Sequence, residues 1–545
     1  MTKKPQNVIF LGIDSLRYDR LVAGGYDYDS APTISFLGKN GIECSRAVTN
    51  SGPTQLAFPS IVTSTYPLDY GGYDNGIVSR PASLAKIFKR ANYSTFGFAQ
   101  DHVNTNANGY ADGYDSYENI YDIDTIWKNA VIYTRYYKEL LKDDRCSKSE
   151  FTELNFTYLS RIIQMTIDYC NDAIREDSTH LDKYKDLYPY DFYEVKKIFE
   201  SHKITINNNK QNFITKYTDA VDINDYFTWV DFIKVYRKYM FSIFFIIKFW
   251  PGLKKYFYRF RGKLFKHFAT STYMTDRFIN WLNFKKDDGF YAFLFFNDLH
   301  ENFTSSGISN AWHKDTNKYL SKSNNKQLSF FEKIKPKTKK TGSLIYDASL
   351  GYVDSEINRI IKFLKDNQLI DNTLVVIFSD HGTEVGENCN RSLTCSFYDE
   401  YVRVPLIFYS PQIKPKSIDT NISLIDLAPT VLDLMGLEIP SYFKGSPVYK
   451  DSMTKRHYTM LENAGRGPCD IMRKPLNISF RNNDWKFIYS ELPALEGKES
   501  FEVELYEIKV DNSEVFDVSC DPKNKPLVDM FIKMAQSRCL EVRNK

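Results

Sequence analysis

Three short apolar runs, each followed by an acidic residue, constrain the fold of this 545-residue chain more than any other feature. The run NVIFLGI leads to Asp14, YAFLFFN leads to Asp298, and TLVVIF leads to Ser379 and Asp380. Their residues are mostly β-branched, aromatic or leucine, and the runs are nearly continuous, whereas a strand with one wet face alternates apolar and polar residues. The runs therefore predict buried, mostly parallel strands of a sheet that is covered on both faces.

Helical patterns alternate with these strands. The segments 81–95, 352–369 and 426–436 each place apolar residues along one face, and in the last segment we expect Asp426 as the N-cap and Gly436 as the stop. This alternation predicts an α/β fold with a doubly wound sheet. Ligands of such folds bind beyond the carboxyl ends of the strands, where the acidic residues above are expected to lie.

The composition changes along the chain and predicts four parts. Residues 1–120 and 286–450 carry the strand–helix alternation and are interpreted as two parts of one α/β core. Residues 121–285, rich in Tyr, Phe, Lys and Asp, predict a mainly helical insertion, and 451–545 predict a C-terminal subdomain with antiparallel strands and a closing helix. The polar, Lys-rich stretch 305–342 predicts a long surface loop or cover.

The net charge, the cysteines and the N-terminus predict the kind of partner, the state of the thiols and the location of the protein. The net charge is only +3, which argues against a nucleic-acid partner. Eight cysteines without a CxxC pair predict reduced, mostly structural thiols. The N-terminal MTKK precedes an apolar run of six residues with no small-residue cleavage site, so we interpret this run as a first strand and expect a cytoplasmic protein.

The segment 231–268 is basic and aromatic. It carries ten Lys or Arg against one acidic residue, and its apolar stretches are far shorter than the roughly 20 residues that span a bilayer. One interpretation is a helix that lies on the inner face of the membrane. The other is a buried helical hairpin broken at Pro251, with a solvated basic face.

Asp14, Asp380 and His381 are candidate metal ligands. Two carboxylates and an imidazole suit Mn²⁺ or Zn²⁺ better than Ca²⁺, which prefers an all-oxygen shell. Asp-His pairs at turns are more often structural than metal-binding, so the sequence leaves both interpretations open.

Thr54 is a candidate nucleophile. It lies where the loop TNSGP meets a predicted helix, and the N–H groups at a helix start can hold an anion. A hydroxyl beside a divalent cation there becomes a usable nucleophile. The alternative is that Thr54 merely caps the helix.

Six blocks in a fixed order carry a family resemblance. The chain resembles the sulfatase-like branch of the alkaline phosphatase superfamily from residue 6 to about 445, and more weakly in its C-terminal region. The resemblance implies an alkaline-phosphatase-like α/β fold and an enzyme of the hydrolase or phosphotransferase type. The blocks are NVIFLGIDSLRYDRL, GPTQLAFPSIVTSTYP, FFNDLHENF, VVIFSDHGTEVGE, YDEYVRVPLIF and SLIDLAPTVLDLMGLEIP.

The resemblance implies roles for matching residues. Asp14, Asp380 and His381 match the metal ligands, which implies one divalent ion, Mn²⁺ or Zn²⁺ by preference, with Ca²⁺ or Mg²⁺ as alternatives. Thr54 matches the Cys or Ser of the motif C/S-x-P-x-R and would join the metal shell. His300, in DLHENF, matches a histidine that contacts the substrate or the leaving group.

The chain departs from the sulfatase motif in ways that change the expected chemistry. Sulfatases oxidise their Cys or Ser to an aldehyde, and Thr54 would give a ketone. Leu56 and Phe58 replace the Pro and Arg of the motif. The pattern is therefore more similar to that of the phosphoethanolamine and phosphoglycerol transferases and the phosphonate and phosphodiester hydrolases, which implies a covalent phosphothreonine.

The substrate implied is an anionic ester, carried by a cell-envelope glycan or a lipid. The alternatives are a sulfuric ester hydrolase and a degenerate protein that binds anionic glycans or lipids without turnover. Further substrate-binding candidates are His102, Asp298, Arg391 and Arg466, although Arg466 also fits a plain Gly-rich surface turn.

Overall fold

A computed structural model of the chain describes most of the sequence, and its contacts divide the chain into two compact units. One unit holds residues 1–98, 111–117 and 270–545, and the other holds 99–110 and 118–269. The residues described are 4–99, 101, 103–119, 123–174, 192–222, 271–285, 289–300, 339–385, 397–450, 457–465, 467–495 and 498–544.

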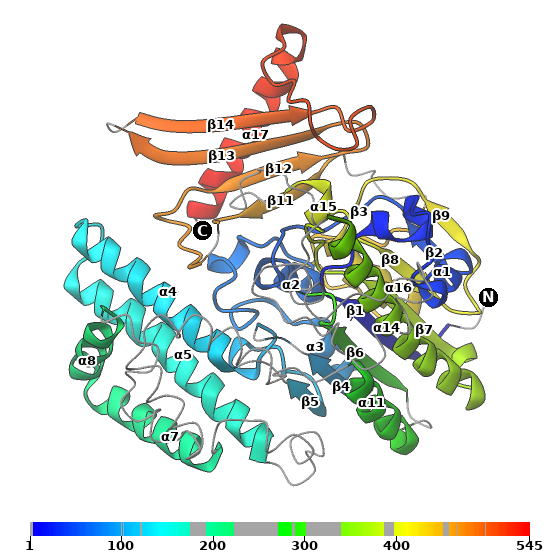
Figure 1. The fold of residues 1–545 in the computed structure, drawn as a ribbon, viewed down its shortest axis with the longest axis horizontal. Coiled ribbons are helices and arrows are strands. Elements are labelled where there is room, and N and C mark those ends of the chain that lie inside the picture. The colour runs from blue at the N-terminus through cyan, green and yellow to red at the C-terminus, as the bar shows by residue number, and fades with distance from the viewer. Residues whose placement is uncertain are drawn as a thin grey trace. The chain divides into compact units, whose positions relative to one another are not determined.

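An eight-stranded sheet is the largest sheet among the described residues (Figure 1). In spatial order its strands are β5 (Ser116–Asn119), β4 (Ser94–Ala99), β6 (Phe290–Phe296), β1 (Asn7–Ile13), β7 (Thr373–Phe378), β8 (Leu406–Tyr409), β2 (Ile42–Cys44) and β9 (Lys416–Ile418). The three predicted apolar runs form β6, β1 and β7, which are adjacent, parallel and buried throughout. β8 runs antiparallel to β7 and β2. The prediction of a largely parallel, buried α/β sheet is confirmed.

The register of these strands explains one glycine. Gly12 in β1 lies opposite Phe295 of β6 and Phe378 of β7. A methyl group at Gly12 would lie 2.6 Å from the Phe378 ring and 2.8 Å from the Phe295 ring. Because a real side chain cannot occupy that space, glycine lets the two aromatic rings close over β1 just before Asp14.

Helices flank the sheet in two packed groups. α14 packs against α1 and α11, whereas α2 packs against α16 and α3. Their bounds are α1 (Pro32–Lys39), α2 (Thr54–Thr63), α3 (Leu84–Arg90), α11 (Ser271–Lys285), α14 (Lys339–Asp366) and α16 (Leu427–Met435).

Asp426 is the N-cap residue of α16, as predicted, but its side chain makes no capping hydrogen bond to that helix. Its carboxylate instead accepts from the Ser423 N–H and closes a capping box on the 3₁₀ turn Leu424–Asp426, which directly precedes α16. One local prediction was wrong: the predicted loop 305–342 ends early, since α14 begins at Lys339, and the rest of that stretch, 305–338, lies outside the described residues. Gly436, with φ +77°, ends α16 as predicted.

The C-terminal subdomain is an antiparallel sheet covered by one helix, as predicted. In Figure 1 its orange strands lie against the red helix α17 (Lys525–Arg543). Phe531 of α17 is fully buried, with its ring centroid 5.0 Å from that of Phe487 and 5.7 Å from that of Phe480. The strands are β11 (Thr459–Asn463), β12 (Asn477–Arg481), β13 (Lys486–Leu495) and β14 (Lys498–Tyr506).

The other unit is helical and has its own core. α4 (Ile123–Lys142), α5 (Lys148–Ile174), α7 (Phe192–Asn208) and α8 (Lys210–Asp222) pack around buried side chains such as Ile163 and Phe199. The basic segment 231–268 lies outside the described residues. Among the helices that are described, none combines the length and the apolarity needed to cross a bilayer.

Candidate metal and nucleophile site

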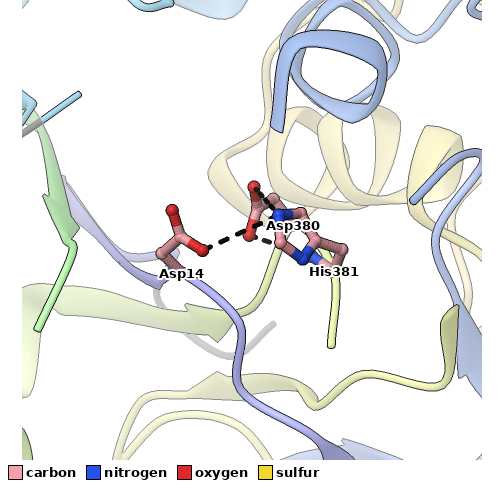
Figure 2. A group of neighbouring side chains, drawn as sticks. All are labelled: Asp14, Asp380 and His381. Atoms are coloured by element: carbon pink, nitrogen blue, oxygen red, sulfur yellow. Dashed lines mark hydrogen bonds and ion pairs between the residues drawn. The ribbon is translucent and has the colours of Figure 1, made fainter. Parts of the chain in front are cut away.

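The ends of β1 and β7 bring two carboxylates and an imidazole together. Asp14 follows β1, and Asp380 and His381 follow β7, which pairs with β1 in parallel. All three side chains are buried. Figure 2 shows them facing one another, and one ligand atom from each lies within 4.8 Å of the others. The predicted grouping of these residues at one edge of the sheet is what the structure shows.

The hydrogen bonds of His381 indicate which ring nitrogen faces the carboxylates. Nδ1 lies 2.6 Å from the carbonyl oxygen of Gly382. A carbonyl can only accept, so Nδ1 carries the proton and Nε2 of a neutral ring presents a lone pair. Nε2 lies 3.7 Å from Asp14 Oδ1 and 3.6 Å from Asp380 Oδ2.

This arrangement fits a divalent cation. Two carboxylates and a lone pair that face one another in a buried space repel unless positive charge lies among them, either a metal ion or the second proton of an imidazolium. Oxygen and imidazole donors together are typical ligands of Mn²⁺ and Zn²⁺. Asp14, Asp380 and His381 are therefore the residues that could hold the metal, whose identity stays a prediction.

Thr54 completes the cluster. It is the first residue of α2, as predicted, and only 8% of its surface is exposed. Its Oγ1 lies 3.2 Å from His381 Nε2 and 3.5 Å from Asp14 Oδ2. The first N–H groups of a helix have no carbonyl partner within that helix, so the start of α2 also presents the positive end of the helix dipole.

Strained backbone follows Asp14 and is held by a tyrosine. Ser15 adopts φ +62°, a left-handed conformation that costs a non-glycine residue about 1 kcal/mol or more. The buried Tyr346 hydroxyl donates to the Ser15 carbonyl (2.9 Å) and accepts from the Arg17 N–H (3.0 Å). The Ser15 hydroxyl donates to Asp14 Oδ1 at 2.7 Å. Tyr346 thereby fixes the turn that aims Asp14.

Ser379 ties the two ligand-bearing loops together. Its hydroxyl accepts from the Leu16 N–H at 2.9 Å and donates to the His381 carbonyl at 2.7 Å. The sequence patterns predicted no role for Ser379 or Tyr346. Ser379 belongs to the motif FSDHG, which also contains the two predicted ligands Asp380 and His381. No local pattern marks Tyr346, which lies 331 residues from Ser15.

The loop before Thr54 is anchored by Asn50. The buried Asn50 side chain donates to Ser423 Oγ (2.8 Å) and the Met460 carbonyl (2.9 Å). Its Oδ1 accepts from the Ile425 N–H at 3.2 Å. These partners belong to the core and to β11, so both parts of this unit fix the path of the chain into α2.

Among the remaining predicted site residues, the structure describes Asp298 and His300. Asp298 is buried, and its carboxylate accepts a hydrogen bond from Ser271. His300 lies in the turn after β6, partly exposed, with its N–H donating to the Asn297 carbonyl at 3.2 Å. His102, Arg391 and Arg466 lie outside the described residues, so their proposed contacts with substrate stay predictions.

Comparisons with known proteins give one consistent family. A family model described as Sulfatase matches residues 6–437. The chain is 38% identical over 104 residues to the uncharacterized sulfatase YidJ of Escherichia coli, and the matched stretch covers 19% of this chain and 21% of that protein. It is 30% identical over 191 residues to an N-acetylglucosamine-6-O-sulfatase of Bacteroides thetaiotaomicron, and this stretch covers 33% of this chain and 30% of that protein. The matched stretches thus span less than a third of these relatives.

Solved structures share the fold over nearly the whole chain. The phosphonate monoester hydrolase of Agrobacterium radiobacter superposes with a TM-score of 0.56 at 16% identity and covers 99% of this chain and 96% of its own. A putative sulfatase from Bacteroides thetaiotaomicron gives a TM-score of 0.55 at 14% identity, with 99% and 93% covered. At this identity the likeness shows the fold alone.

Proposed function

This chain belongs to the sulfatase family, and from that premise we propose that it is a metal-dependent hydrolase or transferase of an anionic phosphate ester, with Thr54 as its nucleophile. One observation carries the proposal: the buried Thr54 hydroxyl lies 3.2 Å from His381 Nε2, beside Asp14 and Asp380. A threonine that only capped α2 would not need two carboxylates and an imidazole around its oxygen.

The identity of the nucleophile favours phosphate over sulfate esters. Oxidation at Cβ of Thr54 gives a ketone rather than the aldehyde formed from Cys or Ser, so Thr54 is suited to attack as a hydroxyl. The motif position of the sulfatase arginine also holds an apolar residue here. Phe58 is 1% exposed and packs edge-on against Phe295, with ring centroids 4.6 Å apart.

The side chains support an in-line substitution at phosphorus. A divalent ion, when bound by Asp14, Asp380 and His381, supplies positive charge that favours the ionised Thr54 hydroxyl and the anionic substrate. Thr54 loses its proton toward Asp14 Oδ2, at 3.5 Å, as its oxygen forms a bond to phosphorus. The bond from phosphorus to the leaving oxygen breaks, and the start of α2 stabilises the equatorial oxygens.

A proton donor completes the first half of the reaction: we assign this role to His300, in the turn after β6, which protonates the leaving oxygen. In the second half, water attacks the phosphothreonine to complete hydrolysis, or an acceptor alcohol attacks to complete transfer. The attacking oxygen gives its proton to His300, and the Thr54 oxygen leaves phosphorus and takes back the proton held by Asp14.

We assign the substrate to anionic esters on glycans or lipids. The name of one relative, N-acetylglucosamine-6-O-sulfatase, indicates an anionic ester on a sugar, which agrees with this class. A phosphate ester on a similar carrier is compatible with the residues at the site. The predicted membrane-surface role of 231–268 would favour a lipid-linked carrier.

The test is a rate comparison with two chromogenic esters. Purified protein supplied with Mn²⁺ or Zn²⁺ is assayed with bis(p-nitrophenyl) phosphate and with p-nitrophenyl sulfate. We expect turnover of the phosphodiester, retention of part of it in Thr54→Ser, and its loss in the isosteric Thr54→Val. Thr63→Val, in the same helix, is the matched control and keeps the rate.

Each other outcome contradicts the proposal in a distinct way. Turnover of the sulfate ester alone identifies a sulfatase. Metal binding without turnover of either ester favours a binding protein. A phosphodiester rate that Thr54→Val leaves unchanged shows that Thr54 is not the nucleophile.

A further inference from the structure

A single helical turn contacts both loops that carry the candidate site. This turn is α15 (Asp399–Val402). The Gly382 N–H, directly after His381, donates to the Tyr401 carbonyl at 2.7 Å. The Thr49 N–H, five residues before Thr54, donates to the Val402 carbonyl at 3.0 Å. The position of α15 therefore bears on both the imidazole and the nucleophile.

Close packing leaves α15 little freedom beside Gly382. A methyl at Gly382 would lie 2.1 Å from the Glu400 carbonyl oxygen and 3.0 Å from its carbonyl carbon. The chain after His381 thus lies directly on the backbone of α15, and a shift of α15 moves or releases that chain.

The C-terminal subdomain holds the first residue of α15. Arg481 of β12 pairs with both carboxylate oxygens of Asp399, through Nε at 3.0 Å and Nη2 at 2.8 Å. Lys486 of β13 donates to Asp399 Oδ1 at 2.5 Å. Glu514 accepts from the Asp399 N–H at 2.8 Å. Arg481 and Lys486 are 3% and 0% exposed, so both cations are buried.

The charges agree with this anchoring. Burial alone would raise the pKa of Asp399, but the neighbouring Arg481 and Lys486 hold that pKa well below its usual range. An isolated turn of four residues is not stable, because nucleating a helix costs more than so few hydrogen bonds return. The helical turn therefore depends on its anchor.

We propose that Asp399 is a positioning residue, which couples the C-terminal subdomain through α15 to the loops that carry His381 and Thr54. Its catalytic consequence rests on the function proposed above, whereas the coupling itself does not. Loss of the Asp399 charge leaves Arg481 without the carboxylate that it contacts and leaves Lys486 with Glu514 as its ion-pair partner, and α15 loses the contact that fixes its start.

The direct test is amide hydrogen exchange of the full chain. In Asp399→Asn we expect the amides of Gly382 and Thr49 to exchange at least tenfold faster than in the wild type. The matched control is Glu491→Gln. The Glu491 carboxylate accepts two hydrogen bonds from the Arg543 guanidinium within the C-terminal subdomain. The side chains of Asp399 and Glu491 are both 17% exposed. The control should leave both amides unchanged.

A milder variant covers a failure of Asp399→Asn to fold. Arg481→Lys keeps the positive charge and removes the bidentate hydrogen bonds to Asp399, so it should raise the exchange rates of the Gly382 and Thr49 amides by a smaller factor. Unchanged exchange at Gly382 and Thr49 in a folded variant would overturn the coupling, and so would equal acceleration in Glu491→Gln.

A metal titration separates this inference from the proposed function. We expect Asp399→Asn to weaken Mn²⁺ or Zn²⁺ binding by about tenfold or more, because ligand orientation sets affinity, with no change in Glu491→Gln. Wild-type protein that binds neither metal would overturn the proposed function, and the exchange result would still decide the coupling. Wild-type affinity in Asp399→Asn would overturn the claim that this coupling reaches the site.

Discussion

Replacing Gly382 by alanine tests how the metal ligands are aimed. The new methyl would lie 2.1 Å from the Glu400 carbonyl oxygen, whereas ordinary contacts begin at 3.4 Å. The backbone after His381 must therefore move away from α15 by about 1 Å, and such overpacking costs about 1–3 kcal/mol of stability. Because misplacement of a reacting group by about 1 Å can cost about 10²-fold in rate, the rate should fall by about that factor while most of the protein stays folded.

The assay combines thermal unfolding, metal titration and the phosphodiester rate. We expect Gly382→Ala to bind metal at least tenfold more weakly and to lose about 10²-fold in kcat/KM. The control is Gly41→Ala, directly before β2 and two strands away from β7, whose methyl would lie 2.5 Å from the Phe408 carbonyl oxygen. It should lower the unfolding temperature with wild-type metal affinity. Wild-type metal affinity and rate in Gly382→Ala would refute this reasoning.

Three further predictions concern the surroundings of the site. Tyr346→Phe leaves the Ser15 carbonyl and the Arg17 N–H without the hydroxyl that joins them, so it should cost about 1–3 kcal/mol in thermal unfolding and weaken metal binding; an unchanged metal affinity would contradict the role given to this tyrosine. Burial raises the pKa of Asp347 to about 6. Between about pH 4 and 6 the folded state therefore holds a proton that the unfolded state has lost. The stabilisation of the folded state by this proton is complete below about pH 4 and is lost as the pH rises through 6. Asp347→Asn should then stabilise the protein by about 1–3 kcal/mol at pH 8 relative to pH 4, measured by denaturant unfolding, and a pH-independent difference would contradict the assignment. Adding Mn²⁺ or Zn²⁺ at about 100 times its Kd should stabilise the wild type by about 3 kcal/mol, a gain that chelation reverses and that Asp380→Asn largely abolishes; equal stabilisation of Asp380→Asn would place the metal elsewhere.

The sequence predicts that Asp14, Asp380 and His381 lie together, because their grouping follows from strand order. Asp14 and Asp380 each follow a continuous apolar run, and such runs become buried parallel strands whose carboxyl ends share one edge. The helix start at Thr54 was also predicted from local chemistry. Its approach to His381, 327 residues away, was not, and only the family resemblance indicated it.

The supporting contacts could not be predicted because they join segments that no local pattern relates. Tyr346 lies on a buried helix face, where periodicity marks a residue as core and says nothing about its hydroxyl. Asp399, Arg481 and Lys486 are three ordinary charged residues in the sequence, and their pairing arises only when the C-terminal sheet packs onto the core. Asp426 shows the same limit locally: it is the N-cap residue of α16, but its carboxylate accepts from the Ser423 N–H of the turn before that helix.

The central claim, that Thr54 forms a covalent bond to the substrate beside a bound metal, has one direct measurement. Purified protein is exposed to generic phosphodiesters and sulfate esters, quenched in acid, and analysed by intact and peptide mass spectrometry with metal quantification of the untreated sample. The account predicts stoichiometric Mn or Zn and a phosphoryl-derived mass increase on the peptide that contains Thr54, absent in Thr54→Val. Metal-free protein with an unmodified Thr54 would contradict it.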